Sequence, residues 1–232
     1  MKPILECKAL GKRYGGVQAL ENVDLTVKPG RVVGLLGPNG SGKTTLIKLA
    51  NGLLTPSSGE ILIAGEKPGV NSKSIVSYLP DRPYLADWMN VRQLMDFFED
   101  FYGDFQRDKA LEMLARLNID EKQRIKQMSK GTREKVQLIL VMSRRAGLYL
   151  LDEPIGGVDP ATRDYILDTI IRNYNPDAAV ILSTHLIADV EQVLDDVIFI
   201  NKGRVVLQSS VDDIREQHGS SVDGYFREVF KC

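Results

Sequence analysis

The chain has 232 residues, of which 43% are hydrophobic and 26% charged, a composition that is ordinary for a folded protein and excludes a disordered one. Its formal net charge is -1, so no overall positive field draws the chain to nucleic acid or to an anionic membrane. Cys7 and Cys232 lack the spacing of a disulfide framework or a metal site, which favours a reducing compartment. No apolar run approaches the roughly 18 residues of a spanning helix, and no signal-peptide segment follows Met1, so we expect a cytoplasmic protein.

Two strands of an antiparallel layer are expected near the start of the chain. Apolar residues alternate or cluster over 4–12 and 23–27, between turn signals. Tyr14 lies between these strands, beside two glycines. A flat aromatic ring at this place could stack on a nucleotide base, and the alternative is a tyrosine in a surface turn. The motif that follows favours stacking.

A phosphate-binding loop joins the apolar strand at 32–36 to the next helix. Its three glycines let the backbone N-H groups point inward, and the helix adds its positive N-terminal end to the same concavity. The pattern G-x-x-x-x-G-K-[ST] assigns Lys43 to the β and γ phosphates and the Thr44 hydroxyl to Mg²⁺. A glycine-rich loop without a chemical role is disfavoured, because strand and helix stand where the motif requires them. The predicted phosphate site comprises Gly37, Pro38, Asn39, Gly40, Ser41, Gly42, Lys43, Thr44 and Thr45.

The middle of the chain changes from strands to helices. Short strands are expected at 60–65 and 74–80. Apolar residues at helical spacing then predict three helices, at 91–98, 110–117 and about 132–144. The methionines and phenylalanines of these helices lie opposite the polar face, so we assign them to the core and not to a cofactor site.

An acidic pair follows the next buried strand. The apolar run 147–151 is typical of a strand buried on both faces, and it ends in Asp152 and Glu153. In phosphate-loop NTPases an Asp at such a strand end holds Mg²⁺, and a second carboxylate can align an attacking water. The alternative is a pair of solvated loop acids, and the phosphate-binding loop earlier in the chain argues against it.

The rest of the chain returns to alternating strands and helices. A helix is expected at 160–174, a buried strand at 179–183 and a second helix at 186–194. A hairpin over 197–208 and a polar helical tail complete the chain. His185 follows the buried strand. A lone histidine is usually structural, but one at this strand end can reach the same phosphates as the acidic pair.

The order of these motifs resembles the nucleotide-binding subunit of an ATP-binding cassette (ABC) transporter. The resemblance covers the whole chain and is carried by several motifs in register, namely the phosphate loop, Met128 to Thr132, Leu148 to Glu153, Val158 to Pro160 and Ser183 to His185. It implies an α/β fold with a phosphate-loop NTPase core, a mostly parallel sheet, an antiparallel β layer and an all-helical subdomain. It also implies one ABC ATPase domain over 1–232, with a core at 1–84 and 146–232 and a helical subdomain at about 85–145.

The resemblance further implies roles for single residues. Tyr14 is similar to the aromatic that stacks on adenine, and Asp152 to the aspartate that holds the metal. Glu153 is similar to the general base, and His185 to the residue that contacts the γ-phosphate. Asp159 is similar to the residue that links two sites across a dimer.

Two positions depart from the family pattern. The usual serine-glycine-glycine-glutamine signature is replaced by Ser129-Lys130-Gly131-Thr132. Ser129 and the backbone at Gly131 are retained before a predicted helix. The N-terminus of that helix can bind the γ-phosphate of ATP held by an opposite subunit. Asp81 stands where the family usually has a glutamine that touches Mg²⁺. Either Asp81 contacts the metal, which we favour, or it turns away and pairs with Arg82 or a membrane partner.

The implied function is ATP hydrolysis, with ATP and Mg²⁺ bound at a dimer interface, coupled to export through a separate membrane subunit. The segment 81–85, Trp88 and the helix around 96–102 resemble exporter-type cassettes. The expected partners are a second copy or a homologous cassette and an integral membrane permease, at the inner face of the cell membrane, with no nucleic acid. The alternative is a soluble ABC ATPase that acts on DNA or ribosomes, but such chains usually carry a coiled coil or two cassettes. A GTPase is weaker still, because Arg204 stands where an acid must contact guanine.

Overall fold

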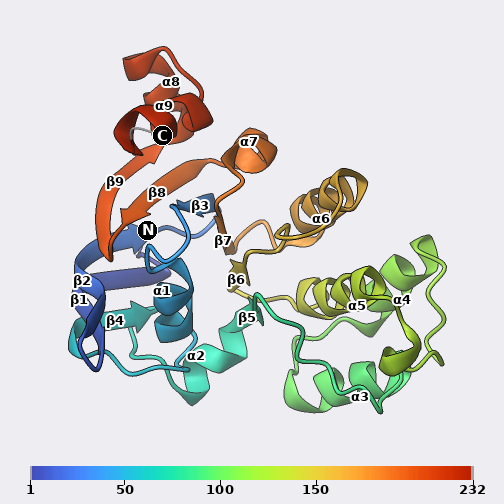
Figure 1. Cartoon of the computed structure of the whole chain (residues 1–232). Helices are drawn as coiled ribbons and strands as arrows, with labels where there is room; N and C mark the ends of the chain where they lie inside the picture. Colours follow the sequence, from blue (N-terminus) through green and yellow to red (C-terminus); the bar gives the residue numbers. More distant parts are fainter. Residues whose placement is uncertain (1, 231–232) are drawn as a thin grey trace.

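A six-stranded sheet forms the centre of the computed structural model, which describes residues 2–230 (Figure 1). The strand order is β5-β6-β7-β3-β8-β9; neighbours are parallel except β9, which runs antiparallel to β8. In this arrangement the carboxyl ends of β3, β6 and β7 meet at one edge. The strands are β3 Val32–Leu36, β5 Val76–Leu79, β6 Leu148–Asp152, β7 Ala179–Thr184, β8 Asp196–Asn201 and β9 Arg204–Ser210.

A smaller antiparallel sheet, in the order β2-β1-β4, packs beside the phosphate-loop helix α1. Its strands are β1 Leu5–Tyr14, β2 Val17–Val27 and β4 Ser58–Ile63, and α1 is Lys43–Ala50. The first two strands are longer than the sequence predicts, because Gly15, at φ 54°, lets the chain turn tightly and Tyr14 pair with Val17. Apolar side chains of this sheet, of α1 and of one face of the central sheet form one buried cluster. Cys7 is a free, buried member of it, and Cys232 lies outside the described residues.

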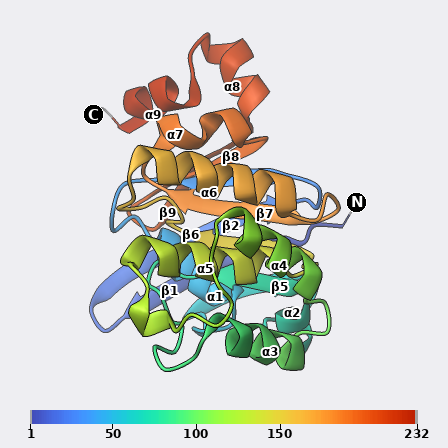
Figure 2. The same cartoon turned by 90° about the vertical axis from the view of Figure 1, so that its right-hand side faces the viewer.

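The helices after β5 cover the other face of the central sheet (Figure 2). Figure 1 shows α3, α4 and α5 as a separate green lobe, which we call the helical lobe. Leu94 and Val136 of this lobe belong to the same buried cluster as Tyr149 of the central sheet, so the lobe and the sheet share a core. These helices are α3 Val91–Phe101, α4 Arg107–Arg116, η1 Ile125–Gln127, α5 Lys130–Met142 and α6 Pro160–Asn173, followed by α7 Ile187–Val190, η2 Glu191–Val193, α8 Val211–His218 and α9 Val222–Phe230.

Several further predicted boundaries differ from the structure, and three of them have a clear local cause. The segment predicted as a strand from residue 74 begins as the end of a helix, α2 Val70–Ile75, because the Ser72 hydroxyl accepts from the N-H of Gly69 and starts a helical turn there. Helix α5 begins two residues earlier than predicted, since the Ser129 hydroxyl caps it by accepting from the N-H of Thr132 at 3.1 Å. The helix predicted at 186–194 is shorter and ends in a 3-10 turn, because Leu194 is extended and leads into β8.

Candidate nucleotide site

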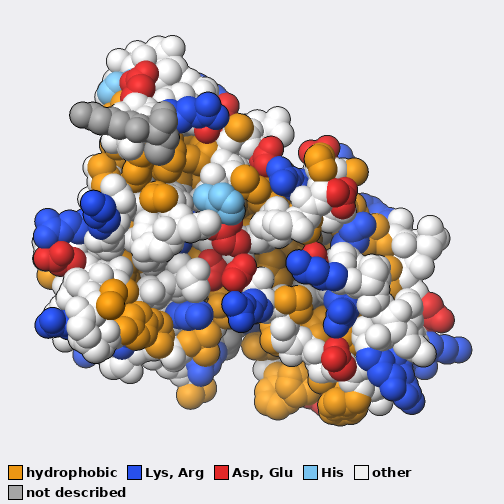
Figure 3. Space-filling model, viewed as in Figure 1, with side chains coloured by type: hydrophobic (Ala, Val, Ile, Leu, Met, Phe, Trp, Pro, Cys, Tyr) orange, Lys and Arg blue, Asp and Glu red, His pale blue; other side chains and the backbone are white. Residues whose placement is uncertain are grey.

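The phosphate loop lines a cleft of about 610 Å³ at the carboxyl edge of the central sheet. Gly40 and Gly42 have φ of 79° and 112°, values that a residue with a side chain rarely adopts. A Cβ on Gly37 would clash with the carbonyl oxygen of Ile200. Figure 3 shows acidic, basic and histidine side chains gathering near the middle of this face. The cleft is lined by Val17, Gln18, Ala19, Asn39, Gly40, Ser41, Gly42, Lys43, Thr44, Thr45, Asp81, Glu153, Gly156, Gly157 and His185.

Lys43 is 5% exposed, and its ammonium group lies inside the loop. It donates to the carbonyl oxygens of Gly37 at 2.8 Å and Pro38 at 3.3 Å. It also forms an ion pair with the Glu153 carboxylate, with 3.3 Å between Nζ and Oε1. A buried cation needs such partners, because isolating it from water is costly. An anion that enters the loop therefore competes with Glu153 for Lys43.

Asp152, at the end of β6, offers oxygen atoms suited to a hard cation. Its Oδ1 accepts from the Ser183 hydroxyl at 2.7 Å and from the Thr44 hydroxyl at 3.1 Å. Its Oδ2 is buried and has no hydrogen-bond partner, and the same is true of the Ser41 hydroxyl oxygen. Burial raises the pKa of Asp152, and the two hydroxyl groups oppose that rise. An unmatched buried carboxylate oxygen beside Thr44 fits a Mg²⁺ ion, which prefers carboxylate and hydroxyl oxygen and takes most of its other ligands from phosphate and water. Among residues 2–230 no group of three His, Cys, Asp or Glu residues forms a complete metal cage.

Glu153 connects Lys43 to His185. Its Oε1 faces Lys43, and its Oε2 lies 3.0 Å from His185 Nδ1. Its backbone has a φ of 50°, which is strained for a residue with a side chain. The N-H of Glu153 donates to Ser183 O at 3.1 Å, and its carbonyl accepts from Gly156 N at 3.0 Å, so the strained conformation is held on both sides. The carboxylate therefore faces the cleft between a cation and an imidazole.

Asp81 lines the same cleft, just beyond β5. Its negative charge contributes to the raised pKa of Asp152. Within the described residues Asp81 forms no ion pair with Arg82. Asp81 is therefore a residue of the cleft lining that is not paired with Arg82.

Gly37, Pro38 and Asp152 lie just behind the lining and contact Lys43 or Thr44. Four other residues that the sequence places at the nucleotide lie apart from this cleft. Tyr14 is on the β1-β2 hairpin, 43% exposed, with Lys12 Nζ 5.3 Å from its ring centre. Ser129 and Gly131 are at the N-terminus of α5. Asp159 caps α6 by accepting from the N-H of Thr162 at 3.0 Å and from its hydroxyl at 2.7 Å, bonds that lower the pKa of Asp159. In one chain these helix ends are separate from the phosphate loop.

Sequence reasoning missed several residues that line the cleft or support the residues that line it. Ser183 holds Asp152 and the backbone of Glu153. Its position at the end of the strand before His185 was a usable signal, because carboxyl ends of neighbouring parallel strands meet. Val17 and Gln18 approach from the antiparallel sheet, and no local pattern indicates that approach.

A second cleft, of about 620 Å³, lies between the central sheet and the helical lobe. Tyr84, Phe98 and Tyr102 contribute aromatic side chains to it. Trp88, shortly before α3, and Phe101, at the end of α3, do not line this cleft and are 69% and 68% exposed. Figure 3 shows hydrophobic side chains gathered at the lower right, over the region of α3. The cleft is lined by Lys48, Asn51, Leu53, Lys73, Val76, Ser77, Tyr78, Pro80, Arg82, Pro83, Tyr84, Phe98, Tyr102, Val141 and Arg144.

Comparison with known proteins shows similarity along the whole chain. The family model described as "ABC transporter" matches residues 20–156. The uncharacterized ABC transporter ATP-binding protein YxlF of Bacillus subtilis is 32% identical over 94% of this chain and 75% of that protein. The SkfA peptide export ATP-binding protein SkfE of Bacillus subtilis is 30% identical over 92% of both chains.

Solved structures show the same likeness. The structure of an ATP binding subunit of an ABC transporter is 30% identical, with a TM-score of 0.88 over 98% of this chain and 99% of that one. The dimeric structure of the bacterial ABC transporter cassette MJ0796, at 22% identity, matches in fold with a TM-score of 0.78 over 89% of this chain and 98% of that one. No helix within residues 2–230 is long and apolar enough to cross a membrane.

Proposed function

Because the chain belongs to the family of ABC transporter ATP-binding proteins, and is an ATPase of that family, we propose that it drives export of a substrate through a separate integral membrane subunit. The predictions of the fold class and of an ABC ATPase are thereby confirmed. The observation that carries the mechanism is the chain of contacts from Lys43 through Glu153 to His185 in the phosphate cleft. Export is supported by the relative named for peptide export. None of the relatives named above is described as acting on DNA or ribosomes.

We propose that ATP reaches its reactive state by displacing one contact of the resting site. The phosphates accept from the loop N-H groups and attract Lys43 away from Glu153. The water oxygen then bonds to the γ-phosphorus while the bond from that phosphorus to the bridging oxygen breaks and ADP leaves. The freed Glu153 carboxylate accepts the proton of the water, and His185 contacts the γ-phosphate. Thr44, Asp152 and Asp81 are the residues that would hold Mg²⁺, which when bound neutralises charge on the phosphate oxygens.

The remaining predicted residues suit a second subunit. The N-termini of α5 and α6 carry Ser129, Gly131 and Asp159 outside the cleft of their own chain. We propose that they reach ATP held by a second copy or a homologous cassette, where a helix N-terminus stabilises the γ-phosphate. ATP then favours the closed dimer, and loss of the γ-phosphate removes that preference. Tyr14 is proposed to stack on adenine.

The second cleft is the proposed contact with the membrane subunit. It is bounded by the segment after β5 and by the helical lobe, so an occupant touches both. We propose a core at 1–84 and 146–232, a helical subdomain at 85–145, and a peripheral location on the inner face of the cell membrane, where a permease presents its cytosolic loops.

Two measurements test this function. Calorimetry is expected to show tight binding of Mg²⁺-ATP to the wild type and its loss in Lys43→Ala, because the cation facing the β and γ phosphates is removed. Lys28→Ala, at an exposed lysine outside both clefts, is the matched control. Unchanged affinity in Lys43→Ala contradicts the phosphate-loop assignment. Failure of the tagged chain to capture any integral membrane protein from detergent-solubilised membranes contradicts the transport function.

A further inference from the structure

A short loop joins Glu153 to helix α6. It comprises residues 154–158, which we call the link loop, and it ends just before Asp159, the N-cap of α6. Its middle contains two glycines, and the second, Gly157, has a φ of 70°. Glycines leave a backbone many accessible conformations. The position of Asp159 therefore depends on the contacts that fix the two ends of the link loop.

The start of the link loop is tied to the segment that carries His185. Glu153 comes directly before the loop, and its Oε2 lies 3.0 Å from His185 Nδ1. Helix α7 begins two residues after His185, and its residues Ile187 and Val190 are buried in the core. We call residues 185–190 the histidine segment. Its buried side chains make it a firm support for any residue that it contacts.

The end of the link loop is tied to the same segment by Arg163, near the start of α6. The Nε of Arg163 donates to the carbonyl oxygen of Val158 at 3.1 Å. Its Nη1 forms an ion pair with Asp189 Oδ2 at 2.7 Å. The planar guanidinium keeps these two donors in a fixed relation to each other. Both ends of the link loop are thus held to the histidine segment.

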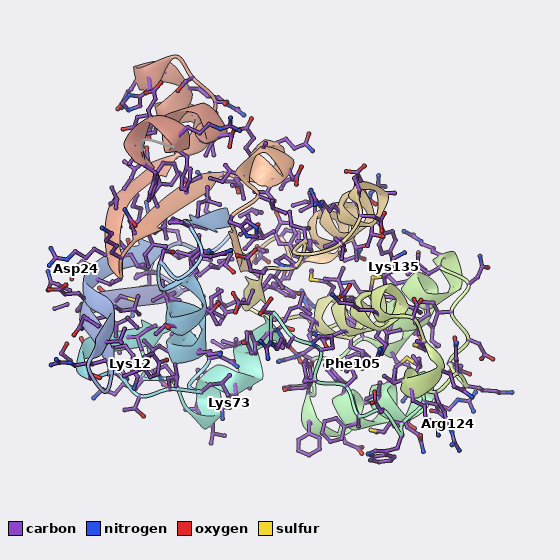
Figure 4. The ribbon with its side chains drawn as sticks, viewed as in Figure 1. Lys12, Asp24, Lys73, Phe105, Arg124 and Lys135 are labelled. Atoms are coloured by element: carbon purple, nitrogen blue, oxygen red, sulfur yellow. The ribbon has the colours of Figure 1, made fainter. Side chains whose placement is uncertain are left out.

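Helix α6 also contacts the helical lobe. Figure 4 marks Lys135 of α5 beside α6, and its Nζ lies 5.4 Å from the ring centre of Tyr165. The hydrogen bonds from Thr162, and to a smaller degree the charge of Lys135, lower the pKa of Asp159. Helix α6 is therefore in contact with the helical lobe on one side and, through Arg163, with the histidine segment on the other.

We propose that Arg163 is a positioning residue that makes the position of Asp159 depend on the γ-phosphate. A γ-phosphate that contacts His185 shifts the histidine segment. The ion pair between Asp189 and Arg163 passes that shift to Val158, at the end of the link loop. Asp159 follows, so the surface offered to a second subunit differs between ATP and ADP. This inference rests on the proposed function, and it names the link within one chain between the nucleotide and the dimer contact.

The exposure of this ion pair fits a positioning role better than a stabilising one. The side chains of Arg163 and Asp189 are 28% and 37% exposed, and ion pairs with such access to water contribute little to the free energy of folding. A rigid guanidinium bound to two elements nevertheless fixes where they lie relative to each other. Removing it is therefore expected to leave the fold and ATP binding intact while it separates the link loop from the histidine segment.

Hydrogen exchange of the whole chain, followed by mass spectrometry, tests this link. Mg²⁺ with a non-hydrolysable ATP analogue, but not Mg²⁺-ADP, is expected to slow exchange in the histidine segment and the link loop by about fivefold or more. In Arg163→Gln the phosphate loop and the histidine segment should respond as in the wild type, whereas the response of the link loop falls below about twofold. Arg172→Gln is the matched control, because it breaks a more exposed ion pair, with Asp168, on the same helix.

Two further variants distinguish this link from a local role of Arg163 in α6. Asp189→Ala leaves Arg163 able to donate to Val158, yet it is expected to reduce the response of the link loop as Arg163→Gln does. The double variant is expected to lose no more than either single variant, because both break the same link. Arg163→Lys keeps the charge without the two fixed donors and is expected to recover only part of the response.

The inference is overturned if the link loop of Arg163→Gln or of Asp189→Ala responds to the analogue as the wild type does, or if the two losses add. It is also overturned if Arg163→Gln loses the response of the phosphate loop, because Arg163 is then needed for binding or folding. Those results leave the proposed export function intact. A wild-type histidine segment that responds equally to the analogue and to ADP contradicts the proposed contact of His185 with the γ-phosphate, and the inference with it.

Discussion

Replacing Glu153 with Gln separates ATP binding from hydrolysis in this site. The amide keeps the size of the side chain but cannot accept the proton of the attacking water. A positioned base contributes about 10²- to 10⁴-fold to a rate, so we expect hydrolysis to fall by at least about 100-fold, or about 2.7 kcal/mol in the barrier.

The affinity of the Glu153→Gln variant for ATP is not expected to fall with the rate of hydrolysis. The gross attraction between Lys43 Nζ and Glu153 Oε1, 3.3 Å apart, is about 5 kcal/mol at an effective dielectric constant of about 20. Desolvation offsets most of this value, because both groups are largely buried. Removing the carboxylate frees Lys43 for the phosphates and removes a repulsive charge. The affinity for Mg²⁺-ATP is therefore expected to stay equal or to increase.

Phosphate release at saturating ATP and calorimetry with Mg²⁺-ATP measure the two quantities. Glu216→Gln, at an exposed site on α8, controls for the loss of one negative charge and is expected to match the wild type. A fall in hydrolysis of less than about tenfold would refute the role of Glu153 as the base. Parallel loss of affinity and rate would refute the competition between Glu153 and ATP for Lys43.

Three other predictions probe separate parts of the chain. Tyr14→Ala is expected to weaken ATP binding by roughly 1 to 3 kcal/mol and Tyr14→Phe to leave it unchanged, because stacking needs only the ring; equal losses in a titration would indicate a hydroxyl bond instead. His185→Ala is expected to spare ATP affinity and lower turnover, because a γ-phosphate contact matters most in the transition state, and a normal phosphate-release rate would assign His185 a structural role. Arg144→Met is expected to lower the free energy of unfolding, measured in urea, by about 3 to 5 kcal/mol, since it leaves Asp104 unpaired and removes the donor from the carbonyl groups of Ser74 and Val76. Arg144→Met/Asp104→Asn should recover part of that loss, and additive losses would show that the pair is not coupled.

The sequence by itself determined the parts of the site that depend on local structure. The phosphate loop is fixed by glycines that allow positive φ and by a lysine and a threonine at set positions, all within eight residues. Asp152 was predictable because a run of apolar residues specifies a buried parallel strand, and the residue at its carboxyl end must face the cleft. The helical lobe was predictable for the same kind of reason, since apolar residues recur at helical spacing. Predicted boundaries were displaced where a single hydroxyl started a helix, that of Ser72 in α2 and that of Ser129 at α5 of the lobe.

Tertiary structure decided which of these parts meet. The contact between Lys43 and Glu153 joins the start of α1 to the end of β6, with the whole helical lobe inserted between them. The basic side chains that line the second cleft, Lys48, Lys73, Arg82 and Arg144, come from four parts of the chain that no local pattern connects. Hydrophobic periodicity specifies which face of an element is buried, but it does not specify which neighbour that face meets. Contacts across the clefts depend on how the sheets and the helical lobe pack against one another, so only the folded chain shows them.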